Sequence, residues 1–154
     1  MRPTILLLLA ASLLAAATAR AETPANPREQ ATRAAVAFVD AFNNLDWERF
    51  EAAWADDATL YMPMPGFPDR LAGREDIMAA FKSLFGDFPE QREGPPYLSI
   101  NPIDLRVDVV GTAAIVTFLL GDESPRQRRT LVFVEQEGIW RIAHLHASRA
   151  PLEH

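Results

Sequence analysis

The spacing of the apolar residues changes once along this chain, near Gly94, and this change constrains the fold more than any other feature. Before Gly94, apolar side chains recur at helical intervals, as in the stripe formed by Ala35, Phe38, Val39 and Phe42. After it, apolar and polar residues alternate with the period of two that is typical of strands with one solvated face. Helices followed by consecutive strands predict an α+β domain built around an antiparallel sheet.

The first part of the chain contains start signals for three helices. Asn26 and Pro27 supply an N-cap and a first-turn proline for the first helix. Asp46 can cap a second, short helix, and we expect Trp54 on the inner side of that helix. Gly73 precedes the third helix, which has acidic residues in its first turn.

The second part of the chain predicts a meander of strands, preceded by one short strand. We expect these strands over residues 58–62, 103–109, 113–120, 129–135 and 139–148. Residues 113–120 are apolar on both sides, so this strand should be central or covered by another subunit. The prolines of residues 63–68 prevent regular pairing and hold Met64 and Phe67 on a stiff loop.

The N-terminal segment has the pattern of a secretory signal peptide. Arg2 provides a positive start, residues 5–17 are an apolar run, and Ala19-Arg20-Ala21 matches a small-x-small cleavage site. The alternative is an uncleaved anchor, although the run is short for a membrane span. We expect cleavage after residue 21, a flexible leader over 22–27 and one domain over 28–151, in an exported protein that is periplasmic or secreted.

Charge and cysteine content limit the possible partners. Cleavage would remove two arginines and no acids, which leaves 13 basic and 21 acidic residues and a net charge of 13 − 21 = −8. This charge argues against nucleic acid and against anionic membranes as partners. The chain has no cysteine, so an exported form would depend on its core alone for stability.

Two of the three histidines, His144 and His146, lie two residues apart on the last predicted strand. We expect them to share a face with Trp140 and Ile142. Imidazole titrates near neutrality, so the pair could act as general base and acid. The alternatives are packed histidines bonded to backbone carbonyls, part of a dimer face, or a metal site, for which no third ligand has suitable spacing.

Tyr61 and a set of apolar residues are the other candidates. The Tyr61 phenol could donate to a substrate carbonyl, or it could simply lie at the rim of a half-buried strand. A pocket for a small apolar ligand is predicted from Trp54, Met62, Met64, Phe67, Phe81 and Phe85. Core packing explains most of this set equally well, with the loop pair Met64 and Phe67 as the exception.

Other motifs are weak or missing. Arg126, Arg128 and Arg129 form a small basic run that we interpret as part of a solvated hairpin. The sequence has no nucleophile signature, glycine-rich phosphate loop or coherent cluster of metal ligands, so we expect neither a cofactor nor a metal.

Three stretches of the predicted domain carry a family resemblance: residues 38–46 with Phe50 and Trp54, residues 56–60 followed by Gly73, and residues 138–151. Through these stretches most of the predicted domain resembles the nuclear transport factor 2-like (NTF2-like) superfamily. The closing Trp-x-x-x-His-x-His-x-Ser pattern and Ile100-Asn101-Pro102 are most similar to the association (hub) domain of calcium/calmodulin-dependent kinase II and its bacterial relatives. The SnoaL-like group of the superfamily is similar as well.

The resemblance implies a cone-shaped domain in which three N-terminal helices pack into a strongly curved antiparallel sheet. It also implies a pocket at the open end and pairing of two subunits through the outer sheet face. Isomerases and dehydratases of this superfamily use a Tyr with an Asp or His in the pocket. The same fold serves cyclases, binding modules and oligomerisation units, so it fixes no activity.

One departure from the hub pattern concerns the pocket. The kinase hub lines its pocket with arginines, and the corresponding positions here are Leu120, Leu131 and Ala147. This difference argues against an acid-binding pocket of the hub type.

The sequence therefore favours an exported homodimer that binds a small, mainly apolar molecule in its cone. The rival hypothesis is a cofactor-independent isomerase, dehydratase or cyclase that transfers protons through His144, His146 or Tyr61. A third possibility is a module that serves only oligomerisation.

Overall fold

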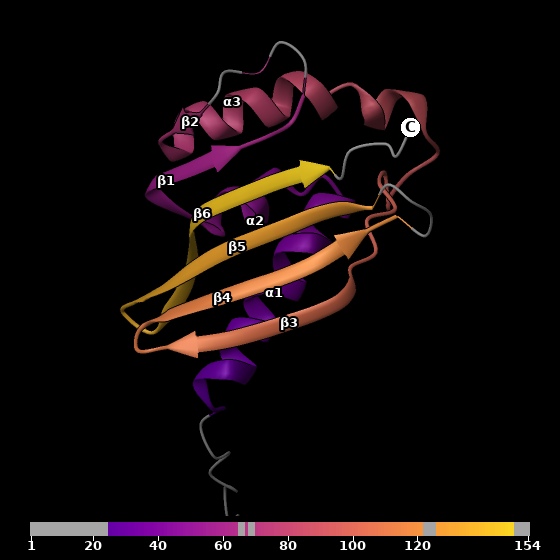
Figure 1. Ribbon diagram of the computed structural model, residues 1–154. Coiled ribbons are helices and arrows are strands. Elements are labelled where there is room, and N and C mark those ends of the chain that lie inside the picture. Colours follow the sequence, from indigo (N-terminus) through magenta and orange to yellow (C-terminus); the bar gives the residue numbers. More distant parts are fainter. Residues whose placement is uncertain (1–24, 65–66, 68–69, 122–125, 150–154) are drawn as a thin grey trace, which may run out of the picture.

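The computed structural model describes residues 25–64, 67, 70–121 and 126–149 (Figure 1). The helices are α1 (Pro27–Asn43), α2 (Trp47–Ala52), α3 (Arg74–Phe85) and the short 3-10 helix η1 (Phe88–Gln91). The strands are β1 (Trp54–Tyr61), β2 (Leu71–Ala72), β3 (Ile103–Val110), β4 (Ala113–Leu120), β5 (Gln127–Gln136) and β6 (Ile139–Arg149). The predicted signal peptide, residues 1–21, lies outside the described residues, as does the start of the predicted leader.

The described strands form one six-stranded sheet in the order β2-β1-β6-β5-β4-β3. Neighbouring strands are antiparallel, as predicted, except that β1 and β6 run parallel. The exception has a simple cause, because two helices and four strands separate β1 from β6 in the chain and no hairpin dictates their relative direction.

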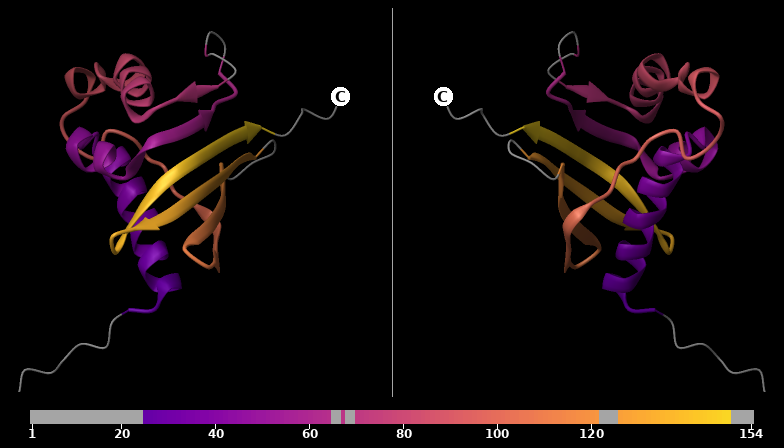
Figure 2. Two further views of the ribbon diagram at one scale, coloured as in Figure 1. Left: turned by 90° about the vertical axis from the view of Figure 1, so that its left-hand side faces the viewer. Right: turned by 90° about the vertical axis from the view of Figure 1, so that its right-hand side faces the viewer.

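The helices lie on one side of the curved sheet, which we call the inner face (Figure 2). No described helix or strand covers the opposite, outer face (Figure 2). The core fills the space between the helices and the inner face, so the molecule has the α+β architecture that the sequence predicts.

An aromatic cluster centred on Phe50 joins the helices to the first strand. The ring centroid of Phe50 lies 5.1 Å from that of Phe38 on α1, 5.0 Å from Phe81 on α3 and 6.0 Å from Trp54 on β1. Such separations are those of favourable stacked or edge-to-face pairs. Phe50 and Trp54 are fully buried. The cluster therefore fixes α1, α2 and α3 against the start of the sheet.

The predicted starts of α1 and α3 are confirmed. Asn26 is the N-cap of α1, where its side-chain oxygen accepts a hydrogen bond of 3.0 Å from the Glu29 N–H, and Pro27 follows at the first position. Gly73 is the N-cap of α3 and has a φ of 93°, which other residues rarely adopt.

The expectation that Trp54 belongs to the second helix is wrong. Helix α2 ends at Ala52, and Trp54 is the first residue of β1, paired with Ile142 of β6. The N–H of Ile142 donates to the carbonyl oxygen of Ala53 at 2.8 Å. Pairing with β6 therefore ends the helix two residues before the last residue of its apolar pattern, Trp54.

The expectation that the two histidines share a face with Trp140 and Ile142 is also wrong. On β5, the adjacent residues Val132 and Phe133 pair with His144 and Ile142, so β6 carries one extra residue at position 143. Such a bulge changes the phase of the alternation. Trp140 and Ile142 are consequently buried on the inner face, whereas the histidines point outward.

Strand β4 has the predicted bounds and lies inside the sheet, between β3 and β5. Its inner-face residues Ala114, Val116 and Phe118 are buried. On the outer face Ile115 is 42% exposed, so the second apolar side of this strand is open to solvent in the single chain.

Candidate functional site

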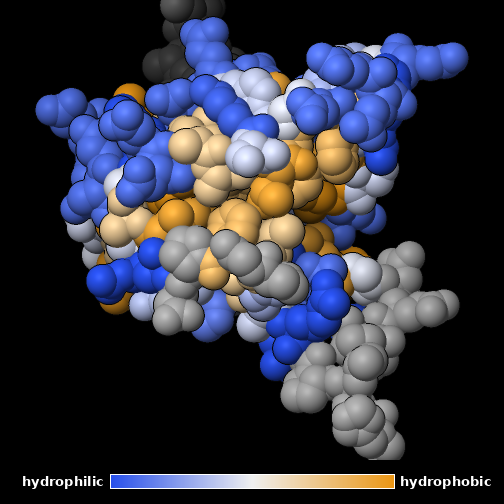
Figure 3. Space-filling model, turned by 90° about the horizontal axis from the view of Figure 1, so that it is seen from above, coloured by the Kyte–Doolittle hydropathy of each residue, from blue (hydrophilic) through white to orange (hydrophobic). Residues whose placement is uncertain are grey.

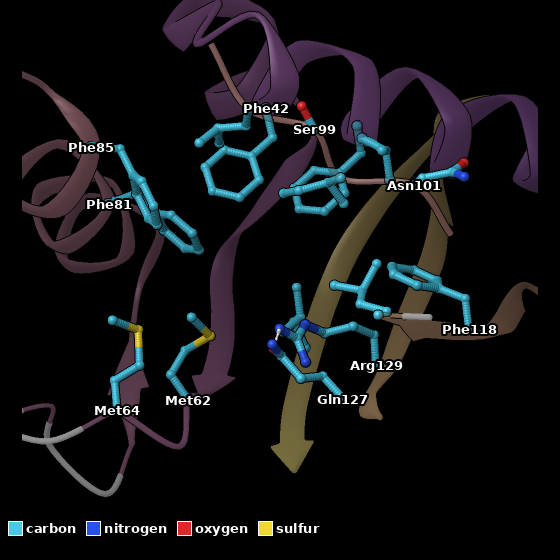
Figure 4. Close-up of a pocket in the computed structure, with 17 residues that line it drawn as sticks. Phe42, Met62, Met64, Phe81, Phe85, Ser99, Asn101, Phe118, Gln127 and Arg129 are labelled. Carbon is cyan, nitrogen blue, oxygen red and sulfur yellow. Dashed lines mark hydrogen bonds between the residues drawn. The ribbon is translucent and has the colours of Figure 1, made fainter. Parts of the chain in front are cut away.

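A cavity of about 530 Å³ lies between the helices and the inner face of the sheet (Figure 4). Helices α1 and α3, the segment 98–101 and strands β4, β5 and β6 all contribute to its wall. This volume falls within the range of small-molecule sites, roughly 300–1,000 Å³. The core of the domain is therefore hollow at the place where the helices diverge from the sheet.

One wall of the cavity is aromatic. The ring centroid of Phe42 lies 5.2 Å from that of Phe81 and 5.1 Å from that of Phe85, both in edge-to-face geometry. Met62 and Met64 present their thioethers beside these rings (Figure 4). Unbranched thioethers adapt to ligands of different shape, so this wall suits a range of apolar groups.

The structure brings most of the predicted pocket residues together. Met62, Met64, Phe81 and Phe85 line the cavity. Trp54 lies deeper, where it supports the wall through Phe81, and its indole N–H has no hydrogen-bond partner among the described residues. Phe67 is not among the described lining residues. Its N–H donates to the Met64 carbonyl oxygen at 3.1 Å.

A polar pair from β5, Gln127 and Arg129, faces the aromatic wall (Figure 4). Nη2 of Arg129 donates to Oε1 of Gln127 at 2.7 Å, and Nη1 donates to the Arg128 carbonyl oxygen at 2.9 Å. The interpretation of the basic run as a solvated hairpin is therefore wrong for Arg129. It holds for Arg126 and Arg128, which are exposed.

The sequence contains a signal for this pair that the basic run obscures. Residues 127, 129, 131 and 133 of a strand share one face, and Leu131 and Phe133 are fully buried on the inner face. Because they share this face with two buried apolar residues, Gln127 and Arg129 are predicted on the cavity side.

Arg129 gives the cavity a positive charge. Burial lowers the pKa of Arg129, and the nearby charge of Arg149 lowers it further, yet an arginine remains protonated in proteins. No other described residue that lines the cavity is charged. Ser99 and Asn101 also contribute to the wall, but their polar ends point away from Arg129 (Figure 4).

The positions that the hub resemblance relates to pocket arginines are apolar here. Leu120 lines the cavity, whereas Leu131 and Ala147 are buried in the inner face. The cavity nevertheless contains an arginine, Arg129, two residues before Leu131. Arg129 and Leu131 both belong to β5, so the cavity cation comes from a different position than the hub-related one on that strand.

The three candidate proton-transfer residues also lie together, but on the outer face. Nδ1 of His144 is 2.8 Å from Oγ1 of Thr59, and the ring centroid of Tyr61 lies 5.5 Å from His144 and 5.8 Å from His146. Leu145, between the two histidines, points to the opposite side and lines the cavity. The sheet therefore separates this cluster from the cavity.

The surroundings of His144 favour its neutral form. Burial lowers the pKa of His144, and the positive charge that His146 can carry lowers it further. Among the described residues no three His, Cys, Asp or Glu side chains lie close enough together to hold a metal ion. In the same part of the chain, no helix is long and apolar enough to cross a membrane.

A family model described as a SnoaL-like domain matches residues 32–153. The chain belongs to the SnoaL-like family. Solved structures agree with this assignment at the level of the fold. An NTF2-like protein of unknown function from Pseudomonas putida KT2440 superposes with a TM-score of 0.67 and 21% identity, over 82% of this chain and 87% of that chain.

Two further neighbours come from different functional settings. A proposed dehydratase of the NTF2-like family from Streptomyces avermitilis has a TM-score of 0.65 and 20% identity, over 80% of this chain and 97% of that chain. The hub of the S. rosetta calcium/calmodulin-dependent kinase II has a TM-score of 0.62 and 23% identity, over 83% and 100% of the two chains. A search of curated proteins gives no match. At these identities the solved structures show the fold alone.

Proposed function

We propose that this SnoaL-like protein is an exported homodimer that binds a small, mainly apolar molecule in the cavity. The observation that carries the binding proposal is the cavity itself, about 530 Å³ with an aromatic and thioether wall. Apolar surface removed from water contributes roughly 25 cal/mol per Å² to binding, so such a wall selects apolar ligands. Seen from above, apolar residues gather at the centre of the molecule and hydrophilic residues surround them (Figure 3).

A fluorescent probe tests the binding proposal. N-phenyl-1-naphthylamine is neutral and becomes brighter in apolar surroundings, and we expect it to bind the wild-type protein. Leu120→Trp places an indole in the cavity and should strongly reduce this signal, as should Met64→Trp, because both side chains line the wall. Val36→Trp is the matched control, since Val36 is 55% exposed on α1. Equal binding to all of these variants would disprove occupation of the cavity.

The outer face of the sheet supports the homodimer proposal. Ile115 of β4 pairs with Val132 of β5, and Thr117 pairs with Thr130 in the next row. No described element covers these residues, and at the sheet edge Val110 is 67% exposed. An open apolar sheet face of this kind is a typical interaction surface.

Light scattering on the purified protein tests the dimer. We expect twice the monomer mass at micromolar concentration, and Ile115→Glu should yield monomers by placing a charge in the interface. Val36→Glu, which changes an exposed apolar residue on a helix, should remain dimeric. A wild-type monomer would overturn this part of the proposal without affecting the cavity.

Export is supported by the sequence pattern of residues 1–21. Expression of the full chain in a Gram-negative host, followed by mass spectrometry of the periplasmic fraction, tests it. A protein that begins at Glu22 is expected. An uncleaved chain confined to the cytoplasm would contradict export.

Proton-transfer catalysis is the alternative, favoured by the contact of Tyr61 with both His144 and His146. It is less well supported than binding, because these side chains lie across the sheet from the cavity. His144→Ala and His146→Ala separate the possibilities. Loss of turnover of a carbonyl substrate with unchanged stability would favour an enzyme, whereas loss of stability or of the dimer would show a structural role.

A further inference from the structure

We propose that the molecule bound in the cavity carries a carboxylate, which Arg129 and Gln127 hold at the end opposite the aromatic wall. This inference rests on the proposed binding function and specifies the class of ligand. The site differs from the arginine positions of the kinase hub, which are Leu120, Leu131 and Ala147 in this chain.

The surroundings of Arg129 strengthen its interaction with an anion. In the sheet Arg129 lies between Phe118 of β4 and Ala147 of β6, which are 5% and 3% exposed. Charges attract more strongly beside such apolar neighbours than in water. An anion that enters the cavity thus meets a cation that is flanked in the sheet by two buried apolar residues.

The hydrogen bonds of the pair leave donors for the ligand. A guanidinium has five N–H donors, and the described contacts of Arg129 engage Nη2 with Gln127 and Nη1 with the Arg128 carbonyl oxygen. Because Oε1 of Gln127 accepts from Arg129, the amide nitrogen of Gln127 is the end that can donate to a ligand. Two adjacent groups that donate match the two oxygens of a carboxylate.

The rest of the cavity fixes the remainder of the ligand. Beyond the polar pair the described wall is uncharged and mostly apolar, and it includes Phe42, Phe81, Phe85 and the two methionines (Figure 4). The complementary molecule is a monocarboxylate with an aliphatic or aromatic body, because a second charge would have no counterpart among the described lining residues.

Competition against N-phenyl-1-naphthylamine tests the inference. Decanoate and decan-1-ol have the same chain and differ in the charged head group. In the wild-type protein we expect decanoate to bind more tightly than decan-1-ol. Arg129→Met, which keeps an apolar stem, should weaken decanoate about 10- to 100-fold and leave decan-1-ol nearly unchanged. Arg129→Lys should retain part of the preference, because it keeps the charge and loses the fork.

The neighbouring Arg128→Met is the matched control, since Arg128 is exposed on the opposite face of the same strand. It should change the binding of neither compound. If decan-1-ol and the naphthylamine bind but decanoate has no advantage, the inference fails while the proposed function stands. If none of the three binds, the proposed function itself fails.

One competing partner for Arg129 is tested directly. The chain carries Asp122 and Glu123 between β4 and β5, outside the described residues. If decanoate gains its advantage only in the double variant Asp122→Asn, Glu123→Gln, the guanidinium is held by an acid of the chain and the inference is overturned. Equal preference in the wild-type protein and the double variant supports the carboxylate site.

Discussion

The bulge at residue 143 predicts that one residue can be deleted from the middle of the sheet. Ala143 is the extra residue of β6, so its removal leaves the pairs Phe133–Ile142 and Val132–His144 in place and turns no side chain to the other face. The deletion therefore removes only the local bend of β6 and requires an adjustment of the paired strand β1. We expect ΔAla143 to fold and to lose about 1–3 kcal/mol of the free energy of unfolding, within the range of ordinary substitutions.

Deletion of Thr117 from β4 is the matched comparison, because β4 pairs with β5 in unbroken register, with Thr117 opposite Thr130, and the register shift on its other side adds a residue to β3 and not to β4. Removing Thr117 turns either Val116 or Phe118 to the outer face, although both are buried in the wild-type protein. Burial of such a side chain contributes roughly 1.5–3 kcal/mol, and an outer-face residue must also enter the core. We therefore expect a loss of about 3 kcal/mol or more from a total of roughly 5–15 kcal/mol.

Urea unfolding followed by tryptophan fluorescence measures both deletions, since Trp54 and Trp140 are buried and report on the core. ΔAla143 should unfold cooperatively at a urea concentration well above that of ΔThr117. If ΔAla143 is unfolded, or is as unstable as ΔThr117, the assignment of Ala143 as a dispensable extra residue is incorrect.

Two further predictions concern stability. Burial lowers the pKa of His144 in the folded protein, so the unfolded chain binds more protons as the pH falls below the ordinary value of about 6.5. The free energy of unfolding should therefore be greatest above that pH and decline below it. Urea titrations at several pH values measure this decline, which should be flatter in His144→Gln. Asn26→Ala removes the side-chain cap of α1 and should cost about 1 kcal/mol in thermal or urea unfolding, whereas Asn26→Asp should preserve stability.

Local signals predict much of this fold. The bounds of β4 follow from an apolar run between glycine-containing turns, and the start of α1 follows from the Asn26 cap. In both cases residues near in sequence determine the structure, so an isolated segment carries the necessary information. The α+β class follows from the same local patterns taken in order.

The remaining features depend on pairing between distant segments. Alanine is accepted on either face of a strand, so the sequence of β6 does not reveal that Ala143 has no pairing partner on β5. Trp54 satisfies the helical spacing of α2, but its pairing with Ile142 draws it into β1. The bulge at Ala143 explains why alternation alone predicts the histidine pair beside Trp140 and Ile142. The inner-face position of Arg129 is predictable from its spacing to Leu131 and Phe133. For the face on which a strand residue lies, the period of two is thus a better guide than the clustering of charges.

The parallel pairing of β1 with β6 has a consequence for biosynthesis. Strand β6 occupies an inner position of the sheet, between β1 and β5, although it is the last described strand to be synthesised. Strand β1 therefore lacks its main partner in the sheet until almost all of the described chain has left the ribosome. Long-range closure of this kind is slow, and a polypeptide that remains open for longer is also easier to thread through a translocation channel.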